Sequence, residues 1–184
     1  MKKSFLAVLL FGIAALSPVT ADTLSNKEGY YLSPFGTYLE PSGESQGSGG
    51  YGAGLGLGKI LNEHFNVELR GFWQNHHNKF HCCGGGETDL IGATVDLQYY
   101  FFRDRFSPYA VAGVGGMINN ITGPALNDFS KESFIFEGGV GSSYSVSKSF
   151  ILRGDVRYRL NTLPDSGVWN DALFNLGFVI PVSF

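Results

Sequence analysis

The chain has 184 residues, a formal net charge of −3, 15% aromatic residues and 26 glycines. This mild acidity without a basic patch argues against nucleic acid as a partner. Beyond the N-terminal segment there is no apolar stretch of the roughly 20 residues that a membrane-spanning helix needs, so a helical membrane protein is excluded.

The N-terminal segment has the layout of a secretory signal peptide. Two lysines precede an apolar run from Phe5 to Leu16, which is too short to span a bilayer, and Val19–Ala21 resembles a cleavage site. We expect residues 1–21 to be cleaved and residues 22–184 to form one exported domain, with an uncleaved anchor as the alternative. Loss of the two lysines lowers Lys+Arg from 13 to 11 against 16 acidic residues, a formal charge of −5.

After this segment, apolar residues recur at every second position over eight stretches of barrel-strand length. The alternation is clearest at the C-terminus, where it continues from Phe174 to Phe184. Period two places such residues on one face of a strand. The predicted strands lie near 29–39, 50–61, 65–74, 89–102, 107–119, 133–146, 149–161 and 172–184.

The predicted connections alternate between short and long. Tight turns are expected at Leu61–His64, Arg103–Arg105 and Ser147–Lys148. Long polar loops are expected at 40–49, 75–88, 120–132 and 162–171. Short turns on one side and long loops on the other are typical of outer-membrane barrels, with the turns in the periplasm and the loops outside.

Sorting each strand by parity separates an apolar face with aromatic ends from a polar face. In the first and fifth strands the residue pattern does not show which set of alternate residues faces inward. The second strand turns Gly52, Gly54, Gly56 and Gly58 inward, which leaves room for long side chains opposite. The charged residues expected on the inner face include Glu68, Arg70, Asp96, Glu137, Arg153, Asp155, Arg157 and Arg159.

The pattern predicts an all-β fold, an eight-stranded antiparallel up-and-down transmembrane β-barrel. A soluble, lipocalin-like barrel would instead bury the apolar face. Three features favour the membrane barrel: the charged face mixes both signs, aromatic residues gather at strand ends, and the apolar row continues to the terminal Phe184. Only helices and closed barrels satisfy their backbone in lipid.

Several segments resemble the OmpA-type family of eight-stranded outer-membrane barrels, which includes opacity-type surface proteins. They are Tyr51–Gly58, Val95–Phe102, Ser107–Gly115 and the terminal Phe184. The resemblance covers the mature chain and implies a Gram-negative outer membrane, with Phe184 serving membrane insertion. It also implies contact with outer-membrane lipid and lipopolysaccharide, periplasmic chaperones and the barrel-assembly machinery. The peptidoglycan-binding domain of longer members is not found in this sequence.

Eight strands enclose a space that side chains fill. We therefore expect an interior charge network of Glu68, Arg70, Asp96, Glu137, Arg153, Asp155 and Arg157. Its main role is expected to be packing and neutralisation. A narrow, gated ion path is the alternative, since ionisable residues inside membrane proteins often mark pathways.

The segment from Asn75 to Gly86 holds three of the four histidines and both cysteines. Imidazole and thiolate suit zinc or copper(I), so His76, His77, His81, Cys82 and Cys83 are weak metal candidates. Their spacing matches no structural zinc pattern, and in an oxidising compartment the cysteines have a disulfide as the alternative. We predict no cofactor and no dedicated metal site.

Two further classes of function remain. A barrel-borne lipid A hydrolase or acyltransferase would need a rigid histidine on an outward strand position, whereas His64 falls in a turn and the others in a loop, so no enzyme is predicted. Binding residues concentrate on loops held by a rigid scaffold, and Trp169 and Phe129 are candidate contacts. The sequence favours a structural, surface-exposed protein that interacts through its external loops with an unidentified host or surface ligand, and a low-conductance porin is the alternative.

Overall fold

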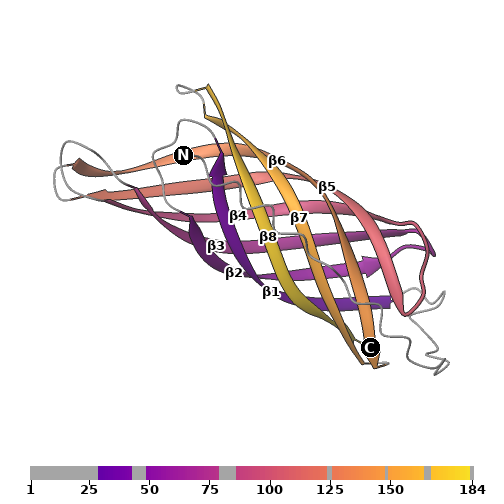
Figure 1. Cartoon of the computed structure of the whole chain (residues 1–184). Helices are drawn as coiled ribbons and strands as arrows, with labels where there is room; N and C mark the ends of the chain where they lie inside the picture. The colour runs from indigo at the N-terminus through magenta and orange to yellow at the C-terminus, as the bar shows by residue number, and fades with distance from the viewer. Residues whose placement is uncertain are drawn as a thin grey trace, which may run out of the picture.

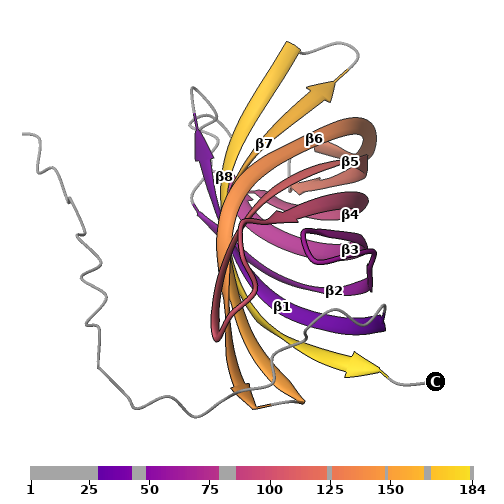
Figure 2. The same cartoon turned by 90° about the vertical axis from the view of Figure 1, so that its right-hand side faces the viewer.

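The computed structural model describes residues 29–42, 49–78, 86–123, 126–147, 149–163 and 167–182. They form eight strands. The strands wind obliquely around one axis (Figures 1 and 2). Across the part of the chain described, no helix has the length and apolar content to cross a bilayer. The strands are β1 (Gly29–Ser42), β2 (Gly50–Ile60), β3 (Phe65–Asn78), β4 (Gly86–Tyr100), β5 (Phe106–Gly123), β6 (Leu126–Ser147), β7 (Phe150–Leu163) and β8 (Gly167–Val182).

Every strand pairs antiparallel with its neighbours in sequence, and β1 also pairs with β8, so the sheet is a closed barrel. Closure leaves no sheet edge unpaired, which is what a sheet needs in order to stand in hydrocarbon. The predicted all-β, eight-stranded antiparallel up-and-down barrel is confirmed. The predicted signal peptide, residues 1–21, lies outside the described residues.

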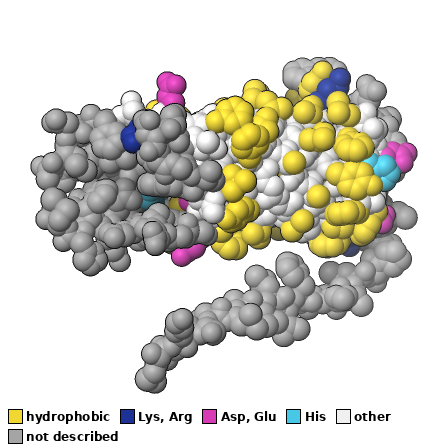
Figure 3. Space-filling view, turned by 90° about the horizontal axis from the view of Figure 1, so that it is seen from above, with side chains coloured by type: hydrophobic (Ala, Val, Ile, Leu, Met, Phe, Trp, Pro, Cys, Tyr) yellow, Lys and Arg dark blue, Asp and Glu magenta, His cyan; other side chains and the backbone are white. Residues whose placement is uncertain are grey.

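The outer wall follows the predicted parity. In β3, for example, Leu69 and Trp73 are half exposed, whereas Glu68 and Arg70 are buried inside the barrel. Figure 3 shows hydrophobic side chains over the middle of one face and charged side chains near its ends. The outward side chains that stay exposed include Tyr51, Leu55, Leu57, Ile91, Val95, Val114, Phe136, Val140, Phe174 and Leu176.

The two ends of the barrel differ. We call the end with the connections β2–β3, β4–β5 and β6–β7 the short-turn end, and the opposite end the hairpin end. The turns lie close to where the sequence predicts them, between Ile60 and Phe65, between Tyr100 and Phe106, and near Ser147.

At the hairpin end three predicted loops are wrong in extent. The stretch 120–132 is largely strand, because β5 and β6 stay paired up to Gly123 and Leu126. Likewise, half of 75–88 and most of 162–171 continue as strand in β3–β4 and β7–β8. Backbone hydrogen bonds hold an antiparallel strand pair together, and outside the lipid such a pair needs no apolar face. Polar sequence at the hairpin end is therefore compatible with strand as well as with loop.

The structure also decides the two strands whose parity the sequence left open. β1 turns Tyr31, Phe35 and Leu39 inward, and β5 turns Tyr109 and Met117 inward, all of them buried. Both strands carry large apolar side chains on their inner faces as well as on their outer ones, so the alternation of apolar and polar residues did not show which face points inward. The lumen therefore contains apolar clusters in addition to charges.

Aromatic rings in the lumen lie directly against glycines of β2. The ring of Tyr31 occupies the space that a Cβ at Gly58 would need, and the ring of Phe35 does the same at Gly54. The sequence predicted that these inward glycines make room for long side chains. The occupants include the two β1 rings, and the Glu68 carboxylate lies against Gly56.

Substitution Gly58→Ala should destabilise the barrel by about 1–3 kcal/mol, because the added methyl group overlaps the buried Tyr31 ring. The measurement is the free energy of unfolding in urea, in detergent or lipid. Gly71→Ala is the matched control, since a Cβ at that outward glycine meets nothing within 4 Å. Equal stability of the two variants would contradict this account of the lumen.

Candidate functional site

The most distinctive feature of the lumen is a layer of buried ion pairs at mid-height. We call it the ion-pair layer. Each member is at most 7% exposed. The alternation of β3, β4, β6 and β7 points these side chains inward from four different strands. The members are Glu68, Asp96, Glu137 and Asp155 with Arg70, Arg153, Arg157 and Arg159.

One pair crosses the barrel. Arg153 of β7 donates two hydrogen bonds to the Glu68 carboxylate of β3, at 2.7 and 2.8 Å. β3 and β7 are not neighbours in the sheet. This fork-to-carboxylate geometry is the strongest form of such an ion pair. The pair therefore connects opposite walls through the lumen.

Arg157 lies at the centre of the layer. It donates to Asp155 at 2.7 Å and to Glu137 at 3.2 Å, and it also contacts Asp96. Arg159 donates to Glu137 at 2.8 Å. Arg70 completes the layer, with its Nη1 3.4 Å from Asp96. The carboxylates thus share several guanidinium groups.

Neutral side chains satisfy much of the remaining hydrogen-bonding capacity. Tyr109 and Asn175 donate to Asp155, each at 2.7 Å, and Gln98 donates to Glu68 at 3.2 Å. The layer has four carboxylates and four guanidinium groups, so its formal charge is zero. Buried charges are tolerated only with such pairing, because removing them from water is expensive.

A small cavity lies at the short-turn end of the lumen. Its volume is about 30 Å³, room for one or a few water molecules, and Tyr31, Tyr100, Arg103 and Ser143 contribute to its lining. Arg103 stacks on the Tyr100 ring at 4.2 Å and donates to Asn66 at 2.6 Å. Arg103 thus links the β4–β5 turn to the start of β3. Partial burial lowers its pKa from the usual arginine value.

The structure brings together all seven residues that the sequence assigned to an interior network, namely Glu68, Arg70, Asp96, Glu137, Arg153, Asp155 and Arg157. Sequence reasoning placed Arg159 on the same face but left it out of the network. Its parity with Arg153 and Arg157 was the available signal. Gln74 was likewise placed on the polar face of its strand and left out of the network, and it accepts a hydrogen bond from Arg159 at 2.8 Å.

The other predicted site residues fall largely outside the described part. His76 lies near the end of β3, and His77 lies in that strand, but the side chain of His77, like His81, Cys82, Cys83 and Phe184, is outside the described residues. Among the residues that are described, no three His, Cys, Asp or Glu side chains gather in a way that could hold a metal ion.

This fold, with its apolar outer wall and charged lumen, defines an eight-stranded outer-membrane barrel. The family model described as the outer membrane protein beta-barrel domain matches residues 4–180, and the chain belongs to that family. None of the curated proteins matches this chain in sequence.

Three solved structures illustrate the similarity. Neisserial surface protein A has a TM-score of 0.68 at 15% identity, over 84% of this chain and 97% of that one. Ail of Yersinia pestis, solved with the heparin analogue sucrose octasulfate, has a TM-score of 0.56 at 13% identity, over 86% and 99%. OprG from Pseudomonas aeruginosa has 0.55 at 15%, over 89% and 100%. At these identities the likeness shows the fold alone.

Breaking the cross-lumen pair tests how the ion-pair layer contributes to stability. Glu68→Gln and Arg153→Met should each cost about 3–5 kcal/mol, because each leaves its partner buried and poorly paired. The double variant should lose clearly less than the sum of the two. Urea unfolding of all three proteins measures this coupling. Glu132→Gln, at an exposed position of β6, is the control. If the loss of unfolding free energy in the double variant equals the sum of the two single losses, the pairing is contradicted.

Proposed function

We propose that this outer-membrane barrel is a sealed, structural protein that presents its hairpin end at the cell surface for interaction with other molecules. The observation that carries the proposal is the ion-pair layer, which fills the lumen at mid-height and joins opposite walls. Glu68 and Asp96 in that layer have no exposure to water. A lumen filled in this way leaves the outer surface and the strand ends as the parts that can meet partners.

The hairpin end is the part we assign to the cell exterior. β5 and β6 are among the longest strands, with 18 and 22 residues, and their hairpin extends from the barrel in Figure 1. A strand of roughly 9–11 residues is enough to cross the hydrocarbon. The surplus carries polar side chains such as Ser130 and Glu132, both exposed. In this orientation the short turns and the C-terminus lie in the periplasm, as in other bacterial barrels.

Lipid and assembly factors are the first partners in this proposal. The half-exposed apolar side chains of the outer wall would contact phospholipid and lipopolysaccharide acyl chains. Delivery to the membrane would use periplasmic chaperones and the barrel-assembly machinery, with the terminal Phe184 as part of the insertion signal.

The polysulfated ligand in the Ail structure is not carried over to this chain. The strand ends at the hairpin end, taken together with the segments that connect them, are acidic in sequence, so a polyanion would be repelled. A cationic surface fits this composition better. The charged residues of these segments are Glu40, Glu44, Glu87, Asp89, Asp128, Glu132, Asp165 and Asp171 against Lys79 and Lys131.

Catalysis is not part of the proposal. His64 lies in the β2–β3 turn, where its ring stacks on Tyr99 and its Nδ1 donates to the Tyr100 carbonyl at 2.9 Å. These contacts attach the turn to the end of β4. They give the imidazole a structural role at the short-turn end.

The second candidate function is a narrow ion path through the lumen. It is favoured by the concentration of ionisable side chains there, because such groups inside membrane proteins often mark pathways. The filled lumen opposes it. Four carboxylates shared among four guanidinium groups would have to rearrange before a hydrated ion could pass.

Exposure of the hairpin end on intact cells tests the orientation. A short epitope inserted between Gly84 and Gly85 should bind antibody on intact bacteria, because this segment joins β3 to β4 at the hairpin end. The same epitope after Lys148, at the short-turn end, should bind only after permeabilisation. The reverse result would remove the proposed surface role.

Electrical recording separates the two candidate functions. The purified protein in a planar bilayer should give no conductance steps, since the charges at mid-height are paired and shielded from water. A large general porin in the same bilayer serves as the positive control. Reproducible steps from the wild-type protein would favour the ion path and remove the sealed-barrel proposal.

A further inference from the structure

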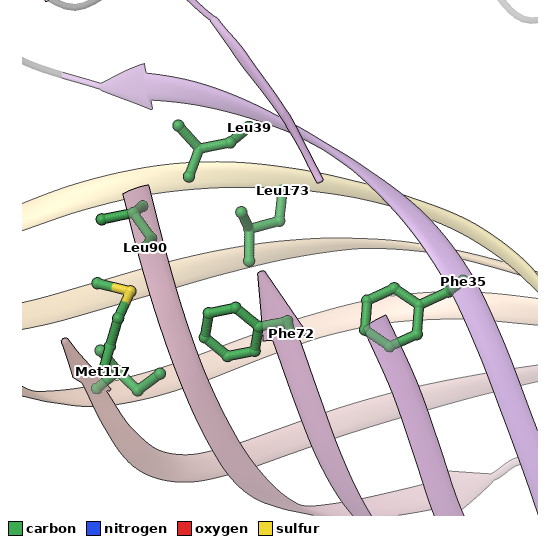
Figure 4. Packing of buried hydrophobic residues seen from close by; sticks show 7 residues of the cluster. Phe35, Leu39, Phe72, Leu90, Met117 and Leu173 are labelled. Carbon is green, nitrogen blue, oxygen red and sulfur yellow. The ribbon is translucent and has the colours of Figure 1, made fainter. Parts of the chain in front are cut away.

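An apolar layer covers the ion-pair layer on the side of the hairpin end. Each of its seven side chains is at most 7% exposed, and they come from β1, β3, β4, β5, β6 and β8. Figure 4 shows the labelled side chains pointing towards one another inside the barrel. The members of this apolar layer are Phe35, Leu39, Phe72, Leu90, Met117, Ile135 and Leu173.

The two layers are in direct contact. The guanidinium of Arg70 lies 4.0 Å from the centre of the Phe35 ring, and that of Arg159 lies 4.5 Å from the centre of the Phe72 ring. Arg159 also contacts the Met117 sulfur at 3.7 Å. The rings thus lie over the charged groups on that side, where hydrating water would otherwise bind.

The layer extends across the lumen from several sides. Leu39 and Leu173 are direct cross-strand partners on β1 and β8, and both are almost completely buried. β2, which supplies no apolar member, presents Gly54, and the Phe35 ring fills that position. On the next strands along, β3 and β4, the Phe72 ring lies 2.5 Å from where a Cβ of Gly92 would stand. Small residues in the wall therefore let large ones fill the middle.

An ion meets different obstacles in the two layers. In the ion-pair layer, fixed charges could replace part of an ion's hydration shell if the pairs rearranged. The seven apolar side chains offer no such replacement, and the buried Thr37 and Gln74 beside them are hydrogen-bonded to each other. Moving an unpaired charge into apolar surroundings carries a large desolvation cost. Apolar constrictions block conduction by excluding water itself. The two layers therefore act in series.

We propose that the apolar layer is a second seal, which keeps water and ions out of the lumen even when the ion pairs are broken. This inference rests on the proposed function, a barrel that is closed in the wild type. With the apolar layer in place, rearrangement of the ion pairs alone does not open a path for ions through the lumen.

Four proteins in planar bilayers test it: the wild type, an ion-layer variant, an apolar-layer variant and their combination. The ion-layer variant is Asp96→Ala with Arg157→Ala, which removes one charge of each sign. The apolar-layer variant is Leu39→Ser with Leu173→Ser. We expect conductance steps from the combined variant and none from the other three proteins.

Each outcome bears on one claim. Steps from the ion-layer variant alone would overturn the second seal and leave the sealed wild type intact, whereas steps from the wild type would overturn the proposed function itself. A folded combined variant without steps would also overturn the inference. Folding is checked by circular dichroism and by the shift in gel mobility between unheated and heated samples.

Two further pairs of substitutions serve as a control and as a replacement. Leu55→Ser with Leu176→Ser makes the same chemical change on the exposed outer wall, and adding it to the ion-layer variant should give no steps. If the combined variant does not fold, Phe35→Leu with Met117→Ser replaces the apolar-layer pair. The same gain of conductance is expected from that combination, and its absence in a folded protein counts against the second seal.

Discussion

The structure depends on one constraint: every backbone N–H and C=O group inside hydrocarbon must find its hydrogen-bond partner within the protein. Pairing of β1 with β8 meets that constraint by closing the sheet. Closure then fixes two environments, lipid outside and lumen inside, and the two-residue period of a strand assigns each side chain to one of them. The apolar wall and the charged lumen both follow from this geometry.

Closure with eight strands leaves a lumen too narrow to stay empty, so the interior has to be packed like a core. This core differs from that of a soluble protein because the apolar surplus of the sequence is already used on the outer wall. Charged residues that neutralise one another fill the middle, and aromatic rings resting on glycines fill the levels on either side. Paired charges fill the lumen at mid-height, and apolar packing fills it above and below.

A barrel of this kind separates its functions by position. In the proposed function, the wall contacts the membrane, the packed lumen gives stability and closure, and the hairpin end is left for recognition. The same fold carries a Neisserial surface protein, a Yersinia pestis attachment protein and a Pseudomonas aeruginosa outer-membrane protein. The closed sheet is thus shared by proteins of only 13–15% sequence identity to this chain, and the fold alone does not assign a function.

The sequence by itself determined the strand count, the parity of most strands and all members of the charge network except Arg159, because alternation is a local property that each strand carries alone. Only the tertiary structure decided three other matters. The partners of each charge, such as Arg153 with Glu68 across the lumen, depend on strands far apart in the chain. The inner faces of β1 and β5 were settled by what the neighbouring strand left room for, as with Tyr31 at Gly58. The length of the hairpins depends on backbone pairing, and the polarity of the side chains does not predict how far that pairing continues.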